Sequence, residues 1–268
     1  MSKDLPHIDI VIIGVNTQDT LSQCVESVSA SNYPADLLHI IYVDGGSTDN
    51  SLEVANDLNS LVTIPLNMKH PTPGKGRNTG WQEGNSELVQ FLDADTVMNP
   101  EWLNNAVEAM TEDISAVCGR RDERYPEKTY FNWIASLEWN GPAGESEAFG
   151  GDVILRRSVL EKTNGYDEIL VGGEDPELSQ RVRRLGGTIK RLETPMTLHD
   201  INMKTLGQYL RRAYRTGYGC AAVSLRHVGA VEGYERPKDP TAEPINLYGF
   251  HKTTLDEILK DAIKVWEA

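Results

Sequence analysis

Cysteine and long apolar runs are both scarce in this chain. Its 268 residues include three cysteines, Cys24, Cys118 and Cys220, which lack the spacing of a metal site and leave one thiol over from any disulfide pairing. Such sparse, unpaired cysteine predicts a reducing compartment. No stretch approaches the roughly 20 apolar residues of a membrane span, and the first residues form no signal-peptide pattern. These absences predict a cytoplasmic protein.

Positive charge is also in short supply. The 26 lysines and arginines face 40 aspartates and glutamates, giving a net charge of -14, which disfavours a general nucleic-acid binder. Residues 201–231 are the exception, because they contain no acidic residue but five cations, Lys204, Arg211, Arg212, Arg215 and Arg226. Two interpretations stay open: residues 204–226 make a peripheral contact with an anionic membrane or acceptor, or they form a helix whose cations are solvated or paired within the molecule.

Both common nucleotide-binding fingerprints are missing. The first predicted strand leads into Gly14-Val15-Asn16-Thr17 and not into a Gly-x-Gly-x-x-Gly turn. The glycine-rich segment 73–80 lacks the Lys-Ser/Thr ending of a Walker A motif. Any nucleotide site must therefore use other residues.

Short apolar runs alternate with helical patterns through the first two thirds of the chain. Runs rich in β-branched residues predict strands at 8–15, 38–43, 61–66, 88–92 and 114–118. Apolar residues at helical spacing follow in 21–28 and 103–110, the latter after Asn99 as the expected N-cap and Pro100 at the first helical position. The alternation predicts an α/β fold whose mostly parallel sheet has helices on both faces and binds ligands at the carboxyl ends of its strands.

Beyond residue 120 the regular alternation ends. Residues 120–150 are expected to form a loop-and-helix excursion. A strand at 153–155, a helix at 176–185, a strand at 188–192, an irregular tail at 233–250 and an amphipathic helix at 254–266 are predicted to follow.

Two carboxylates come directly after the fourth predicted strand. Asp93 and Asp95 are separated by one residue, so both can face one point at the carboxyl end of that strand. Such oxygen donors suit Mg²⁺ or Mn²⁺, which complete their coordination with water and substrate phosphates. His199, after a later strand, is a further candidate ligand. The alternative is a solvated loop.

Acidic and basic residues mark three more candidate segments. Asp44 ends the second strand before a glycine pair, where it can accept hydrogen bonds from a base or ribose, although the glycines can also serve the turn alone. Lys75 and Arg77 lie just before a helical pattern, where cations and amides favour a diphosphate. Asp175, followed by Pro176, is either a helix N-cap or a general base.

Taken in this order, the segments resemble family 2 glycosyltransferases of the GT-A fold, from residue 8 to about residue 219. The matching segments are Asp44-Gly45-Gly46-Ser47-Thr48-Asp49, Gly76-Arg77-Asn78-Thr79-Gly80, Asp93-Ala94-Asp95, Phe149-Gly150-Gly151-Asp152 with Arg156-Arg157, and Gly165-Tyr166-Asp167-Glu168 through Glu174-Asp175. The resemblance implies a Rossmann-like, mostly parallel sheet flanked by helices. It implies a GT-A domain at 1–200, with a nucleotide-binding half at 1–120 and an acceptor half at 121–200, and a helical extension at 201–268.

The resemblance also implies the activity and the roles of residues. A sugar would pass with inversion from a nucleoside diphosphate sugar, with UDP favoured, to a hydroxyl of a saccharide, lipid-linked or small-molecule acceptor. Asp175 would be the base, and Mg²⁺ or Mn²⁺ would be held by Asp93, Asp95 and His199. The nucleotide would contact Asn16, Asp44, Gly46, Lys75, Arg77 and Asp93, and the donor sugar and acceptor would contact Gly151, Asp152 and Glu174.

Three departures from the family pattern qualify this resemblance. Gly76 replaces a usual alanine, Asp152 stands where asparagine or a small residue is common, and the Gln-x-x-Arg-Trp motif of processive synthases is absent, which argues against polymer synthesis. A nucleotidyltransferase and a non-catalytic nucleotide-sugar-binding protein remain the alternative functions.

Overall fold

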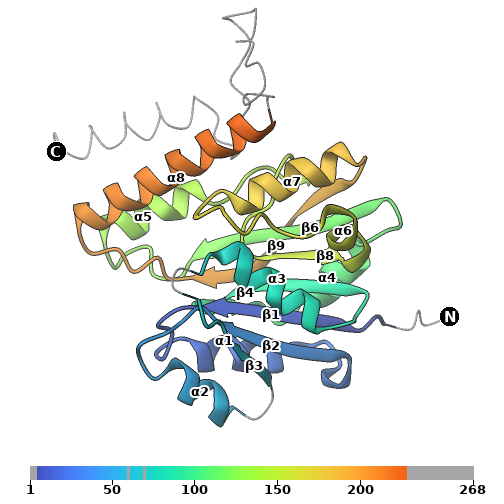
Figure 1. Ribbon diagram of the computed structural model, residues 1–268, viewed down its shortest axis with the longest axis horizontal. Helices are drawn as coiled ribbons and strands as arrows, with labels where there is room; N and C mark the ends of the chain where they lie inside the picture. Colours follow the sequence, from blue (N-terminus) through green and yellow to red (C-terminus); the bar gives the residue numbers. More distant parts are fainter. Residues whose placement is uncertain (1–4, 59–60, 69–70, 228–268) are drawn as a thin grey trace, which may run out of the picture.

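The computed structural model describes residues 5–58, 61–68 and 71–227 (Figure 1). The strands are β1 Ile8–Gly14, β2 Leu38–Asp44, β3 Leu61–Pro65, β4 Leu88–Asp93, β5 Thr96–Met98, β6 Ile114–Glu123, β7 Gly144–Glu145, β8 Val153–Arg156 and β9 Thr188–His199. The helices are α1 Leu21–Ser29, α2 Ser51–Asp57, α3 Pro73–Glu83, α4 Trp102–Ala109, α5 Tyr130–Glu138, α6 Arg157–Thr163, α7 Glu174–Arg184 and α8 Leu206–His227, with a 3₁₀ turn at Ala35–Leu37. The tail predicted at 233–250 and the helix predicted at 254–266 lie outside the described residues.

The strands form one sheet in the order β3-β2-β1-β4-β8-β6-β9-β5, and β7 pairs with β9. The longer pairings, β1 with β2 and β4, β2 with β3, and β6 with β9, are parallel. β8 runs antiparallel between β4 and β6. The predicted α/β fold with a mostly parallel sheet is confirmed.

Each face of the sheet carries its own core. On one face, α1 and α4 bury Leu21, Val25 and Trp102 against side chains of β1 and β4. On the other face, Trp81 of α3 and Leu178 of α7 pack on alternate residues of the same strands. Because successive strand residues point to opposite faces, strands covered on both sides must be apolar throughout, which explains the continuous apolar runs of the sequence.

Four predicted element boundaries were wrong. The strand predicted at 114–118 continues to Glu123, into the segment expected to be a loop-and-helix excursion, because residues 120–123 pair with β9. The last strand continues to His199 because residues between 195 and 199 pair with β5 and β6 across register shifts, and no local sequence pattern predicts these contacts. Helix α4 begins at Trp102, because the side chain of Asn99 accepts from the amide of Glu101 and residues 99–101 form a turn. Helix α7 begins at Glu174, with Gly173 and not Asp175 as its N-cap.

The basic region at 201–227 lies mainly in α8. This helix lies beside α5 and α7, at the end of the molecule away from β3 and α2 (Figure 1). Within the described ranges, no helix is both long enough and apolar enough to cross a membrane.

Candidate active site

A cavity of about 770 Å³ opens where β1, β2 and β4 end. The residues of the predicted site that line it are Arg77, Asp93, Asp95, Gly151, Glu174, Asp175 and His199. Asp44 lies at its edge, since Val43 and Gly45 on either side of it are lining residues. Asp93 and Asp95, at and after the end of β4, therefore line one cavity with Glu174 and Asp175 at the start of α7, whereas Asp44 at the end of β2 lies beside it.

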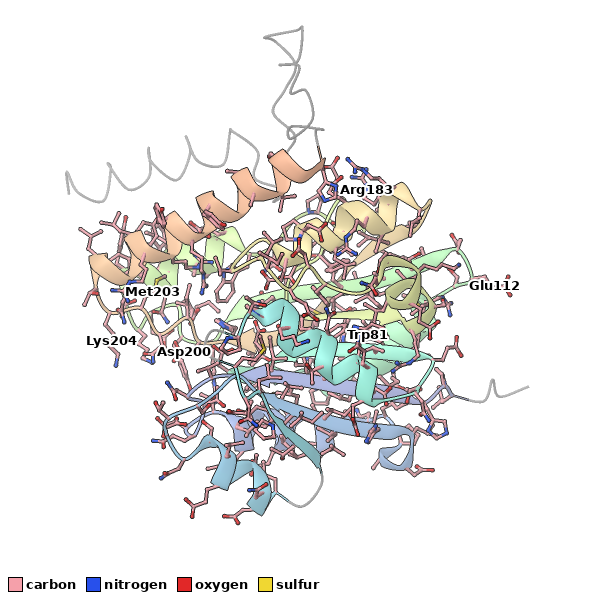
Figure 2. All side chains as sticks on the ribbon, in the orientation of Figure 1. Trp81, Glu112, Arg183, Asp200, Met203 and Lys204 are labelled. Carbon is pink, nitrogen blue, oxygen red and sulfur yellow. The ribbon has the colours of Figure 1, made fainter. Side chains whose placement is uncertain are left out.

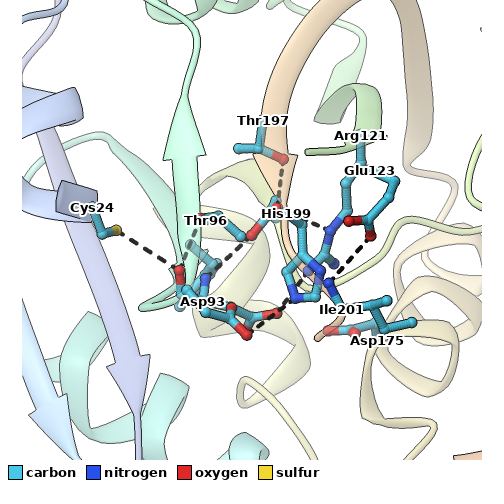
Figure 3. A network of polar contacts seen from close by, with 12 residues as sticks. Cys24, Asp93, Thr96, Arg121, Glu123, Asp175, Thr197, His199 and Ile201 are labelled. Carbon is cyan, nitrogen blue, oxygen red and sulfur yellow. Dashed lines mark hydrogen bonds and ion pairs between the residues drawn. The ribbon is translucent and has the colours of Figure 1, made fainter. Parts of the chain in front are cut away.

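Two arginines hold the carboxylate of Asp93. Nη2 of Arg77 lies 3.0 Å from Oδ1. Nη2 of Arg121 lies 3.3 Å from Oδ2, and Figure 3 shows Arg121 and Asp93 in the network around the site. Burial acts to raise the pKa of Asp93, but the two guanidinium groups outweigh it and hold that pKa below its usual value. Asp93 is thus ionised and oriented before any ligand arrives.

Arg77 connects Asp93 to the start of α7. Its side chain is only 3% exposed, and Nη1 lies 2.8 Å from Oε1 of Glu174 and 3.6 Å from Oδ1 of Asp175. The ring of Tyr166 lies 5.4 Å from the guanidinium carbon. This one buried cation contacts three carboxyl groups. The Gly-rich segment is therefore part of a helix that places a positive charge at the lining of the cavity, and it is not a flexible surface loop.

Asp175 is not a capping residue. It is the second residue of α7, and its buried Oδ1 accepts no hydrogen bond within the described structure. Burial raises the pKa of Asp175 to about 8, with Arg77 opposing and Glu174 adding to the rise. The interpretation of Asp175 as an N-cap is wrong, and what remains is a carboxyl group of high proton affinity that faces the cavity.

Asp95 and His199 form the candidate metal pair. Oδ2 of Asp95 lies 3.1 Å from Nε2 of His199, and the edge-to-face ring of Trp139 lies 5.0 Å from the imidazole. Two ligand atoms at right angles on an octahedral ion, each at about 2.1 Å, are about 3.0 Å apart, so this spacing fits one shared cation. No group of three His, Cys, Asp or Glu side chains gathers as a metal site in the described part of the chain. Two side chains, Asp95 and His199, therefore fit as metal ligands. Asp93, the third predicted ligand, instead forms ion pairs with Arg77 and Arg121.

Asp152 and Gly151 shape the wall beside Asp93. The buried carboxylate of Asp152 accepts hydrogen bonds from the amide of Asp93 at 3.2 Å and from Oγ1 of Thr197 at 2.6 Å, and burial raises its pKa. A Cβ at Gly151 would lie 2.6 Å from Nη2 of Arg77, so any side chain there would disturb the Arg77–Asp93 ion pair. Asp152 thus positions the backbone of Asp93 from a buried location.

The predicted nucleotide turn is tightly organised. Oδ2 of Asp44 accepts from the amides of Gly46 and Ser47 at 2.9 Å, and Oδ1 accepts from the hydroxyls of Tyr42 and Ser47. Asn16 joins this turn to β1, because its Oδ1 accepts from the amide of Thr48 at 2.8 Å. Asp44 is fully buried, and its carboxylate stabilises the turn that follows β2.

Lys75 is not a lining residue of the cavity. Its Nζ forms an ion pair with Oε2 of Glu168 at 3.1 Å. Of the two cations in the Gly-rich segment, the structure brings only Arg77 to the lining of the cavity.

A family model matches the part of the chain that holds much of this site. The model described as glycosyl transferase family 2 matches residues 9–163, more than half of the chain, and spans the nucleotide turn, Arg77 and the Asp93–Asp95 segment. The chain belongs to glycosyltransferase family 2. A second model, described as the N-terminal domain of galactosyltransferase, matches residues 133–205 of this glycosyltransferase.

Relatives and solved structures agree with this assignment. "Glycosyltransferase AglE" of Haloferax volcanii is 22% identical over 86% of this chain and 80% of its own length. "Probable glycosyltransferase YdaM" of Bacillus subtilis is 27% identical over 73% of this chain, which spans 51% of that protein.

Solved structures share the GT-A fold. A mannosyltransferase from Pyrobaculum calidifontis, in complex with GDP-Man and Mn²⁺, superposes with a TM-score of 0.65 at 18% identity over 88% of this chain and 67% of its own. TarS 1-349 of S. aureus, in complex with UDP-GlcNAc, gives a TM-score of 0.66 at 16% identity over 85% and 68%.

Two residues of this glycosyltransferase site were missed from the sequence. Arg121 holds Asp93, and its guanidinium carbon lies 5.3 Å from the ring of Trp139, which in turn packs on His199. Arg121 lies near the end of β6 and Trp139 directly follows α5, in the 120–150 stretch where the sequence alone shows no regular pattern. The one available signal was the Arg120-Arg121 pair, which ends a buried strand in an acidic chain.

Proposed function

We propose that this glycosyltransferase transfers a sugar with inversion from a nucleoside diphosphate sugar to an acceptor hydroxyl, with the help of Mg²⁺ or Mn²⁺. UDP-sugars are the favoured donors, and GDP-sugars are the next to test, because the similar solved structures include complexes with UDP-GlcNAc and with GDP-Man. The observation that carries the proposal is Asp175, whose buried Oδ1 lacks a hydrogen-bond partner among the described residues and which lines the same cavity as Asp93 and Asp95.

Asp175 is the proposed general base. Its carboxylate takes the proton of the acceptor hydroxyl as that oxygen forms a bond to the anomeric carbon. The bond from the anomeric carbon to the donor diphosphate breaks at the same time, through a transition state in which positive charge spreads over the sugar ring. Direct displacement of this kind inverts the anomeric configuration, and the nucleoside diphosphate leaves.

Arg77 and Arg121 set the charges around this step. They fix Asp93, so that its oxygens can accept from the donor's ribose or sugar hydroxyls. Asp95 and His199 would hold the divalent cation, with phosphate oxygens and water completing its shell. A cation held there would supply Lewis-acid neutralisation of charge on the departing diphosphate.

A nucleotide-release assay tests the proposal. The full chain is incubated with a panel of UDP- and GDP-sugars, with and without Mn²⁺, and the released nucleoside diphosphate is measured. We expect Mn²⁺-dependent release that Asp175→Asn abolishes while donor binding is kept. Asp113→Asn, at an exposed aspartate before β6, is the matched control and keeps full activity. Normal turnover by Asp175→Asn contradicts the assignment of the base.

The metal pair has its own test. Asp95→Asn and His199→Ala should each weaken Mn²⁺ binding to the nucleotide-loaded protein, as measured by electron paramagnetic resonance, with donor affinity in the absence of metal unchanged. Full Mn²⁺ affinity in both variants would remove these two residues from the metal site.

A further inference from the structure

The two sides of helix α8 have opposite surroundings. Its inner side is well packed: Val223 is fully buried, the ring of Tyr209 stacks on that of Phe131 at 5.5 Å, and Nη1 of Arg212 lies 3.1 Å from Oε2 of Glu138. Its outer side carries large apolar groups in solvent: Leu206 is 60% exposed, Leu210 57%, Tyr214 78% and Tyr218 49%. We call these four residues the outer stripe.

The geometry of the outer stripe is that of a membrane-surface helix. A step of four residues turns an α-helix by about 40°, so the stripe covers about 120° of the helix surface and runs about 18 Å along it. An apolar face of this width is normally buried against another element. None of the described elements covers the outer stripe, since its members stay about half exposed or more.

Charge identifies the surface that this helix fits. Residues 201–227 hold five cations and no carboxylate, within a chain of net charge -14. Arg212 is paired with Glu138, but no ion pair forms between Arg211 or Arg215 and any described residue, and both side chains are exposed. Figure 2 shows Lys204 just before the start of α8. An apolar stripe beside cations that pair with no described residue suits anionic lipid headgroups.

The same helix lines the cavity. Arg211, Arg212 and Arg215 are lining residues, and so is Val171, which is 53% exposed on the neighbouring loop. A Cβ at Gly219 would lie 2.8 Å from the carbonyl oxygen of Gly172, so the backbone of α8 is in close contact with the turn that precedes Asp175. A surface that binds the outer stripe therefore lies next to the mouth of the cavity.

We propose that α8 docks this enzyme on an anionic membrane surface. The outer stripe enters the headgroup region, and Lys204, Arg211 and Arg215 contact lipid phosphates. The cavity is then held close to the bilayer, where a lipid-anchored acceptor is available. The docking of α8 does not depend on the proposed sugar transfer. The inference that the acceptor is lipid-anchored does rest on that proposed function.

Vesicle flotation of the full chain tests the docking. Two vesicle types are used, pure phosphatidylcholine and phosphatidylcholine mixed with phosphatidylglycerol. We expect the protein to float with the mixed vesicles only and to be released by added salt. Leu210→Ser/Tyr214→Ser should abolish flotation, and Arg211→Gln/Arg215→Gln should lower partitioning by about 30-fold, at about fivefold for each cation.

A matched control and a second readout separate the possible failures. Leu185→Ser changes a leucine that is 61% exposed on α7, and this variant should float like the wild type. Donor hydrolysis in solution should be unchanged in Leu210→Ser/Tyr214→Ser, because neither residue lines the cavity. The docking is overturned if the wild type fails to float, or if both α8 double variants float as well as the wild type. If the wild type hydrolyses none of the donor sugars, the proposed function is refuted instead.

Discussion

The pH dependence of turnover follows directly from the surroundings of Asp175. Burial raises the pKa of this carboxyl group to about 8, and the adjacent Glu174 adds to the rise against the opposing charge of Arg77. A general base works only in its ionised form. Raising the pH from 6 to 9 should therefore switch the base on.

The size of the effect follows from that pKa. With a pKa of about 8, about one tenth of the enzyme carries an ionised Asp175 at pH 7 and about one hundredth at pH 6. We expect kcat/KM to rise about tenfold per pH unit below pH 8 and to level off above it. Glu174→Gln removes one of the negative charges that raise the pKa, so its profile should level off at a lower pH.

The assay is kcat/KM from nucleotide release across this pH range, at fixed ionic strength and Mn²⁺. A profile that is flat from pH 6 to 9, or one that is identical in the wild type and Glu174→Gln, would refute the assignment of the titrating group to Asp175. The Asp113→Asn control should reproduce the wild-type profile.

The same carboxyl group makes stability depend on pH. Its folded pKa of about 8 lies above its unfolded value of about 3.9, so the folded state holds the proton more tightly. This contribution to stability is complete below the unfolded pKa and is lost as the pH rises toward 8. The slope is about -1.4 kcal/mol per pH unit in the free energy of unfolding. Asp175→Asn should remove this slope, as measured by urea unfolding at pH 5 and pH 7; an unchanged slope would contradict the raised pKa.

Three further substitutions test the packing of the site. Arg77→Ala removes the buried cation beside Glu174 and Asp175 and leaves Asp93 with Arg121, and it should cost about 3–5 kcal/mol in urea unfolding, whereas a loss under about 1 kcal/mol would show that the pairing is weak. Tyr166→Phe removes a buried hydroxyl that has no partner in the described structure, so stability should stay within about 1 kcal/mol of the wild type. Gly173→Ala places a Cβ at a φ of 87° and 2.9 Å from the backbone of Gly219, and should lower stability by about 2 kcal/mol or more.

The strand ends of the site could be predicted because local patterns determine them. Asp44 and Asp93 end β2 and β4 as the apolar runs indicated, and parallel neighbours bring their ends together. The argument that Asp93 and Asp95 face one point was only partly right. Both line the cavity, but β4 ends at Asp93 and Asp95 lies in the following turn, so alternation along a strand does not govern it. The two carboxylates consequently have different partners, arginines for Asp93 and His199 for Asp95.

Other parts of the site depend on contacts between distant segments. Arg77 meets Glu174 across 97 positions of sequence, and Arg121 meets Asp93 across 28. No single window of sequence contains either pair, so periodicity and capping signals do not report them. At Asp175 the local signal was misleading, because Asp-Pro is a typical helix start, yet Gly173 takes the cap position with a positive φ.

The glycine contact between α8 and the turn before Asp175 divides this helix into two parts with separate constraints. Gly219 and Gly172 meet through backbone atoms, so position 219 cannot accept a larger residue without a shift of the turn before Asp175. Positions 206, 210, 214 and 218 do not line the cavity, and their side chains are about half exposed or more. Homologous enzymes could therefore exchange these outer residues to suit a different location or acceptor, while the chemistry beneath the helix stays the same.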